Sequence, residues 1–120
     1  MEQLRALDQR IVCGLERVGA EPSFAREHLW LTFYLAGSEH GLAKVAGSLA
    51  AQGWSSVGGW ETAFIYPKRQ VRKAAPEILQ VAYDVEELCH PHGVKILQID
   101  ADTSPNVDQS TFVCLFRSPP

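Results

Sequence analysis

The chain has 120 residues, of which 46% are hydrophobic and 21% charged, and its formal net charge at pH 7 is −3. This length suits a single domain with its own hydrophobic core, and this composition excludes an intrinsically disordered protein. The excess of acidic over basic residues gives no overall attraction for nucleic acid, so nucleic-acid binding would need a local basic patch.

The beginning of the chain predicts a helix followed by a strand. From about residue 3 to 18, apolar residues recur at spacings of three and four, which is typical of an amphipathic helix, and Gly19 ends it. The run LWLTFYLAG (29–37) is dense in aromatic and branched residues. It therefore predicts a buried strand near the centre of a sheet.

The middle of the chain predicts a second helix and then two strands. Ser38 is a good N-cap for a helix with one apolar face that ends at Gly53. The stretch WSSVGGWETAFIYP (54–67) has two glycines between extended segments, which predicts a hairpin closed by a proline. The basic run KRQVRK (68–73) is then interpreted as a solvated loop.

The last part predicts a helix and two further strands. Pro76 fits the first turn of a helix with an apolar face that finishes at Cys89, and Pro91 disfavours a helical conformation of His90. The stretch VKILQIDAD (94–102) predicts a strand with one wetter face. After a turn-rich loop, TFVCLFR (111–117) predicts a final strand.

This order of elements predicts an α+β fold. The middle six elements match a ferredoxin-like β-α-β-β-α-β sandwich, to which the chain adds an extra N-terminal helix and an extra C-terminal strand. We expect a single domain over 1–120, with the N-terminal helix in 1–20, the core in 28–102 and the added strand in 110–117. The N-terminal helix, the last strand or a second copy of the chain, as in a homodimer, would cover the open face of the sheet.

Two stretches carry a family resemblance: LERVGAEPSFAREHLWLTFYLAGSEHGLAKVAGSLAAQGW (15–54) and VEELCHPHGVKI (85–96). They contain a helix ending in glycine, a histidine before an aromatic strand, an Ala-rich helix closing in glycine and an aromatic residue, and a helix ending in His-Gly. In the first stretch these features fall on Leu15, Gly19, His28, Phe33, Ala43, Ala46, Leu49, Gly53 and Trp54. Over about residues 7–101 the chain thus resembles the RraB family, bacterial regulators of ribonuclease E.

The resemblance implies a ferredoxin-like domain that binds a protein, with ribonuclease E as the expected partner, and that has neither catalytic activity nor a cofactor. The sequence leaves open an alternative, a module that binds a small ligand, phosphate or nucleic acid through the basic run. Its cations are Lys68, Arg69, Arg72 and Lys73. Nucleic acid is the less expected ligand, because the strand ETAFIYP (61–67) lacks the base-stacking pattern of RNA-recognition domains.

Tryptophan is enriched where proteins bind one another, so Trp54 and Trp60 are candidate partner contacts. Packing in the core or in a dimer is the alternative for these two residues and for Trp30. The first ten residues lack a signal-peptide core and no apolar run is long enough to cross a bilayer, which predicts a cytoplasmic protein without a membrane segment.

Groups that could perform chemistry have simpler interpretations. In LCHPHGV (88–94), Cys89 and His90 are neighbours that diverge on a helix, so we expect Cys89, His90 and His92 to end a helix and bind no metal. Cys13, Cys89 and Cys114 are expected to be reduced thiols. His28 is interpreted as structural, and Asp100 and Asp102 as a solvated strand end, so no catalytic residue is predicted.

Overall fold

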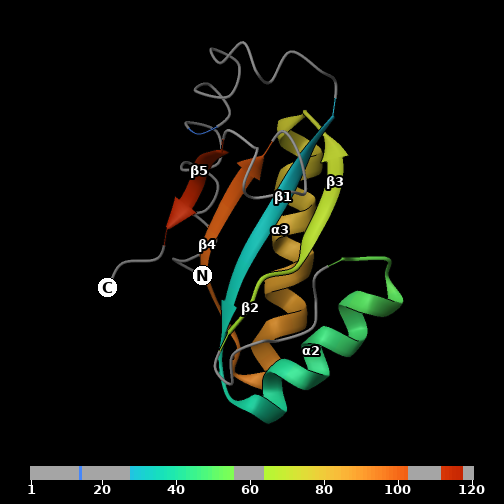
Figure 1. Cartoon of the computed structure of the whole chain (residues 1–120), viewed down its shortest axis with the longest axis vertical. Helices are drawn as coiled ribbons and strands as arrows, with labels where there is room; N and C mark the ends of the chain where they lie inside the picture. The colour runs from blue at the N-terminus through green and yellow to red at the C-terminus, as the bar shows by residue number, and fades with distance from the viewer. Residues whose placement is uncertain (1–13, 15–27, 56–63, 103–111, 118–120) are drawn as a thin grey trace.

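The computed structural model describes Gly14 and residues 28–55, 64–102 and 112–117. In chain order these form β1 (His28–Ala36), α2 (Glu39–Ala51), β2 (Phe64–Ile65), β3 (Lys68–Arg72), α3 (Ala75–Cys89), the 3₁₀ helix η2 (His90–His92), β4 (Lys95–Asp102) and β5 (Phe112–Arg117) (Figure 1). Over the described ranges the fold is α+β, with two α-helices and an antiparallel sheet of five strands.

The strand predicted to be central is central. Strand β1 pairs with β4 on one side and with both β2 and β3 on the other, and β5 pairs with the far side of β4. Beyond β3, Ser55 forms an isolated antiparallel bridge with Lys68. Every strand pair is antiparallel, and the arrangement is compatible with the ferredoxin-like fold that the order of elements predicts.

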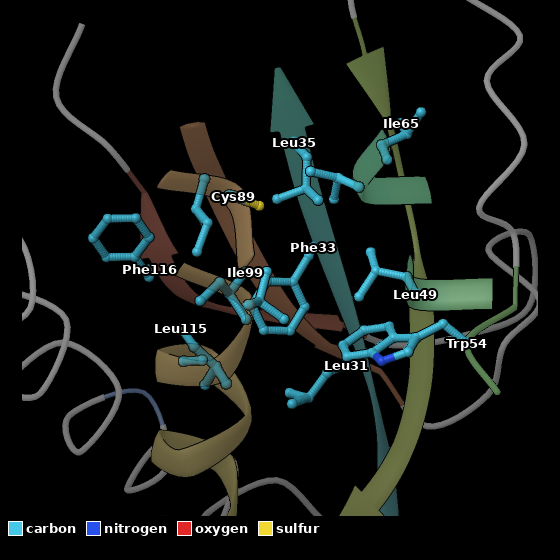
Figure 2. Close-up of a cluster of buried hydrophobic side chains, with 14 of the residues drawn as sticks. Leu31, Phe33, Leu35, Leu49, Trp54, Ile65, Cys89, Ile99, Leu115 and Phe116 are labelled. Carbon is cyan, nitrogen blue, oxygen red and sulfur yellow. The ribbon is translucent and has the colours of Figure 1, made fainter. Parts of the chain in front are cut away.

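The two faces of β1 differ because successive side chains of a strand point in opposite directions. The odd-numbered residues from Leu29 to Leu35 are buried in the core that α2 and α3 complete, and α3 crosses behind β1 in Figure 1. Figure 2 shows Phe33 at the centre of this cluster, between Ile99 and Trp54. The even-numbered residues of β1 lie on the opposite face of the sheet.

Helix α2 begins and ends as the sequence predicts. The hydroxyl oxygen of Ser38 accepts a hydrogen bond of 3.1 Å from the backbone N–H of Gly41, and Gly53 follows the helix with a φ of +88°. Gly41 also lies close to η2, because a β-carbon at this position would stand 2.5 Å from the carbonyl oxygen of His92. Only glycine allows α2 and η2 to approach this closely.

Of the helix predicted over 3–18, Gly14 alone is described. It has a helical backbone and is buried, and a β-carbon there would stand 2.6 Å from Cδ2 of Leu115 in β5. The other residues of this prediction lie outside the described ranges, as do the predicted Gly58-Gly59 turn and Trp60.

Two predictions of local structure are wrong. Residues 68–72 form a strand and not a loop, because they pair with β1 over its first five residues and bury Val71 in the core. His90 has helical backbone angles despite preceding Pro91, since the chain continues from α3 into η2, where the fixed φ of proline suits the start of a helix. Gly93 then ends η2 with a φ of +67°.

Candidate functional site

The four cations of the basic run do not form one patch. Because β3 is a strand, the side chains of Lys68 and Arg69 leave it on opposite faces. The guanidinium of Arg69 lies over the indole of Trp54, 5.7 Å from the ring centroid, and Arg72 forms an exposed ion pair of 3.1 Å with Glu77. Lys73 follows the end of the strand and is half-buried. A phosphate group could therefore contact only part of the run at once.

Trp54, a candidate partner contact, is a core residue. Its side chain is 5% exposed and packs edge-on against Phe33, with ring centroids 5.5 Å apart and planes at 78°. Its buried indole Nε1 has no hydrogen-bond partner in the described part of the chain. Since Arg69 covers the ring, a partner would contact Arg69 before it could contact Trp54. Trp60 lies outside the described residues.

A buried polar network lies on the face of the sheet opposite the helices. Thr32 in β1 accepts a hydrogen bond of 2.9 Å from the ammonium of Lys68 in β3, and its hydroxyl donates one of 3.4 Å to Oδ2 of Asp102 in β4. Their exposed fractions are 2%, 8% and 6% respectively. Burial makes these contacts important, because a charged group removed from water is costly unless it is hydrogen-bonded.

A second set of contacts extends this face toward β5. The amide of Gln98 donates a hydrogen bond of 2.8 Å to Oδ1 of Asp100, and Nε of Arg117 donates one of 3.2 Å to Oε1 of Gln98. Burial raises the pKa of Tyr34 far above its ordinary value, and the hydrogen bond to Asp100 and the negative charge of that residue raise it further. The Tyr34 phenol therefore stays protonated and can act only as a neutral hydrogen-bonding group.

Asp100 and Asp102 share a face, as their spacing predicts, but the interpretation as a solvated strand end is wrong. Both are more than nine-tenths buried, and β4 lies between β1 and β5, so neither residue is on an edge strand. One feature of the sequence could have predicted this buried polar face. In β1, Thr32 and Tyr34 alternate with apolar residues and so place polar atoms on one face of a buried strand. Lys68 gave no such local signal, since its partner is 36 positions away.

The cysteine and histidines of LCHPHGV are separated by the end of α3. Cys89 is completely buried, whereas His90 and His92 are exposed in η2. Among the described residues, no three His, Cys, Asp or Glu side chains are grouped so that they could hold a metal ion. Cys89 and Cys114 are free thiols, and Cys13 lies outside the described ranges. His28 is exposed at the start of β1, opposite Arg72.

Cys89 should make stability depend on pH in the alkaline range. Burial, with a smaller effect of the Glu86 charge, raises the pKa of this thiol to about 12, whereas an unfolded thiol ionises near about 8.5. Between these two pKa values the thiol is ionised in the unfolded chain but still protonated in the folded one. The free energy of unfolding therefore falls as the pH rises, by up to about 1.4 kcal/mol per pH unit. Urea unfolding at about pH 8 and about pH 10.5 should show a larger loss for the natural chain than for Cys89→Ala. Equal losses in the two proteins would contradict this role of Cys89.

No helix in the described ranges is both long and apolar enough to cross a membrane. A scan against family models and searches of curated proteins and of solved structures find no match to the chain.

Proposed function

We propose that this chain is a cytoplasmic, non-enzymatic regulatory domain of the RraB type, which binds ribonuclease E and inhibits it by occluding part of its surface. The observation that carries the proposal is the sequence resemblance over residues 15–54 and 85–96. Its aromatic strand, Ala-rich helix and His-Gly helix end coincide with β1, α2 and the α3–η2 junction.

The proposal includes the ferredoxin-like fold. In that fold the first strand lies between the fourth and the third, and the second lies at the edge beyond the third. Here β1 lies between β4 and β3. The position beyond β3 is taken by the chain that follows α2, where Ser55 bridges Lys68, and not by the strand labelled β2, which pairs with β1. Strand β5 then extends the sheet on the side of β4. The strand pairings support three of the four positions of the fold, and at the remaining edge position the described residues form only the isolated Ser55–Lys68 bridge.

Binding of phosphate or nucleic acid through the basic run has less support. The cations of β3 leave the strand on two faces, the Lys68 ammonium is buried against Thr32, and Arg72 is paired with Glu77. A protein partner can instead use backbone groups and apolar surface as well as charge.

Binding of the purified chain to purified bacterial ribonuclease E tests the proposed function. We expect a dissociation constant of about 1 μM or lower, a binding free energy of about −8 kcal/mol, in biolayer interferometry. We also expect slower cleavage of a fluorescent RNA substrate as the chain is added. An unrelated ribonuclease serves as the control for specificity. Absence of binding at about 100 μM chain, or binding of the RNA substrate instead of the enzyme, would refute the proposal.

A further inference from the structure

The outward side of α3 carries an open groove near the end of the helix. The opposite side of α3 packs on the sheet, behind which the helix lies in Figure 1. The groove has a volume of about 830 Å³, within the range of pockets in which proteins bind ligands. Tyr83, Leu88 and Pro91 line it with apolar surface. Tyr83 and Leu88 are only half-buried against the core, so part of each side chain is accessible from the groove.

The groove has a negatively charged rim. Its walls include the carboxylates of Asp84, Glu86 and Glu87, but no lysine or arginine of the described residues. None of these three carboxylates forms an ion pair within the described part of the chain. Asp84 accepts a hydrogen bond of 2.9 Å from the amide of Gln80, which leaves its charge in place. The groove is therefore complementary to a cation that lies next to an apolar group.

The last turn of α3 holds two of these charges in an unfavourable place. The helix dipole leaves partial negative charge at the C-terminal end of a helix, where a cation is stabilising and a carboxylate is not. Because α3 ends at Cys89, Glu86 and Glu87 lie in its last turn, and that turn has no basic residue. A cation bound in the groove would offset the carboxylates and the dipole together. Binding sites are places where proteins keep such local costs in the free chain.

We propose that a basic, partly apolar segment of a partner protein docks in this groove. A cationic side chain of the segment binds Glu86 and Glu87, and a neighbouring apolar side chain packs on Leu88 and Pro91. Arginine suits the site best, because its planar guanidinium can pair with a carboxylate and stack on the Tyr83 ring. This inference rests on the proposed function, because it takes the partner to be a protein.

Other occupants fit the groove less well. Nucleic acid or an anionic lipid surface would bring phosphate groups against three carboxylates. A second copy of the chain, placed groove to groove about a two-fold axis, would bring the same carboxylates against their counterparts. These side chains are also not grouped so that they could hold a metal ion, since the described residues contain no such group. A basic segment of another protein meets none of these obstacles.

Two synthetic peptides test the docking site on the full chain. Both have eight residues in which leucine alternates with a charged residue, arginine in one and glutamate in the other. In NMR titrations, the arginine peptide should shift the amide signals of Glu86, Glu87, Leu88 and His90, and the glutamate peptide should not. Raising the salt concentration from about 50 mM to about 500 mM should weaken binding, because salt screens exposed charges. Equal effects of the two peptides, or shifts confined to another surface, would overturn the proposal.

Matched variants separate the groove from the overall negative charge of the chain. Glu87→Gln removes one charge of the groove, whereas Glu39→Gln removes one exposed charge from the first turn of α2. We expect Glu87→Gln to weaken binding of the arginine peptide about threefold, the effect of one exposed ion pair. The double variant Glu86→Gln, Glu87→Gln should weaken it about tenfold, and Glu39→Gln should leave it unchanged. Equal weakening by Glu39→Gln and Glu87→Gln would contradict a site in the groove.

The same two single variants test the unfavourable position of the charge. Glu39 lies at the positive end of the α2 dipole and Glu87 at the negative end of the α3 dipole. Glu87→Gln should therefore raise the unfolding temperature slightly while it weakens binding. Glu39→Gln should lower the unfolding temperature and leave binding intact. A lower unfolding temperature for Glu87→Gln would assign this carboxylate to the stability of α3 and would count against its role in docking.

Binding to ribonuclease E distinguishes this inference from the proposed function. If ribonuclease E binds the natural chain and the double variant equally well, the docking site is wrong and the proposed function stands. If the arginine peptide binds in the groove while ribonuclease E does not bind the chain, the docking site stands and the proposed function is wrong.

Discussion

Phe33→Ala is expected to lower the free energy of unfolding by about 3–5 kcal/mol. Phe33 is completely buried at the centre of β1, where its ring packs against the edge of Trp54. Strands flank it on both sides and helices lie above it, so the surrounding backbone cannot collapse into the space left by the ring. The loss therefore combines reduced apolar burial with the cost of a cavity.

Urea unfolding followed by tryptophan fluorescence measures this loss. Phe33→Leu, which keeps most of the side-chain volume, should cost less than Phe33→Ala. Lys95→Ala, at an exposed position of β4, should change stability by less than about 0.5 kcal/mol. If Phe33→Ala changed stability as little as Lys95→Ala, the central position of Phe33 in the core would be wrong.

Two glycines of α2 should respond to alanine in opposite directions. At Gly41 an added β-carbon would stand 2.5 Å from the carbonyl oxygen of His92 and 3.1 Å from Oγ of Ser38. Gly41→Ala must therefore push η2 away from α2 or distort the N-cap, at a cost of about 1–3 kcal/mol. At Gly47 no atom lies within 4 Å of the added carbon. Gly47→Ala should stabilise the protein by about 0.5–1 kcal/mol, because alanine favours the helix.

The unfolding temperatures of the two variants, measured by circular dichroism, provide the comparison. Each variant is the control for the other, since both make the same chemical change in the same helix. A gain in stability for Gly41→Ala similar to that for Gly47→Ala would show that η2 does not lie against the start of α2.

Strong local patterns predicted the central strand and the two helices that the structure describes. The dense apolar run of β1, the capped helix α2 and the striped helix α3 each carry several residues that agree on one structure, and each is found. Strand β3 could not be predicted in the same way, because Val71 is the only apolar residue in its five positions. Its conformation depends on pairing with β1, which is about forty residues earlier in the sequence.

The candidate site was harder to predict than the fold. Four cations in six residues indicate a patch only if the chain there is a loop, and the strand sends Lys68 and Arg69 to opposite faces. The burial of Lys68 cannot be predicted from its neighbours in the sequence. It depends on which side chains of β3 lie on the same face of the sheet as Thr32 in β1. An open pocket between β3 and α3, lined by residues of both elements, depends in the same way on α3, which comes later in the chain.

The hydroxyl of Thr32 joins three strands, since it binds Lys68 from β3 and Asp102 from β4. A slip of β3 by one residue along β1 would turn every side chain of β3 to the other face and bring the Lys68 ammonium among Leu31 and Phe33. Such an unpaired charge in the core is strongly unfavourable. We therefore expect this buried contact to matter most during folding, when it penalises misaligned pairings that the apolar residues of these strands would otherwise tolerate.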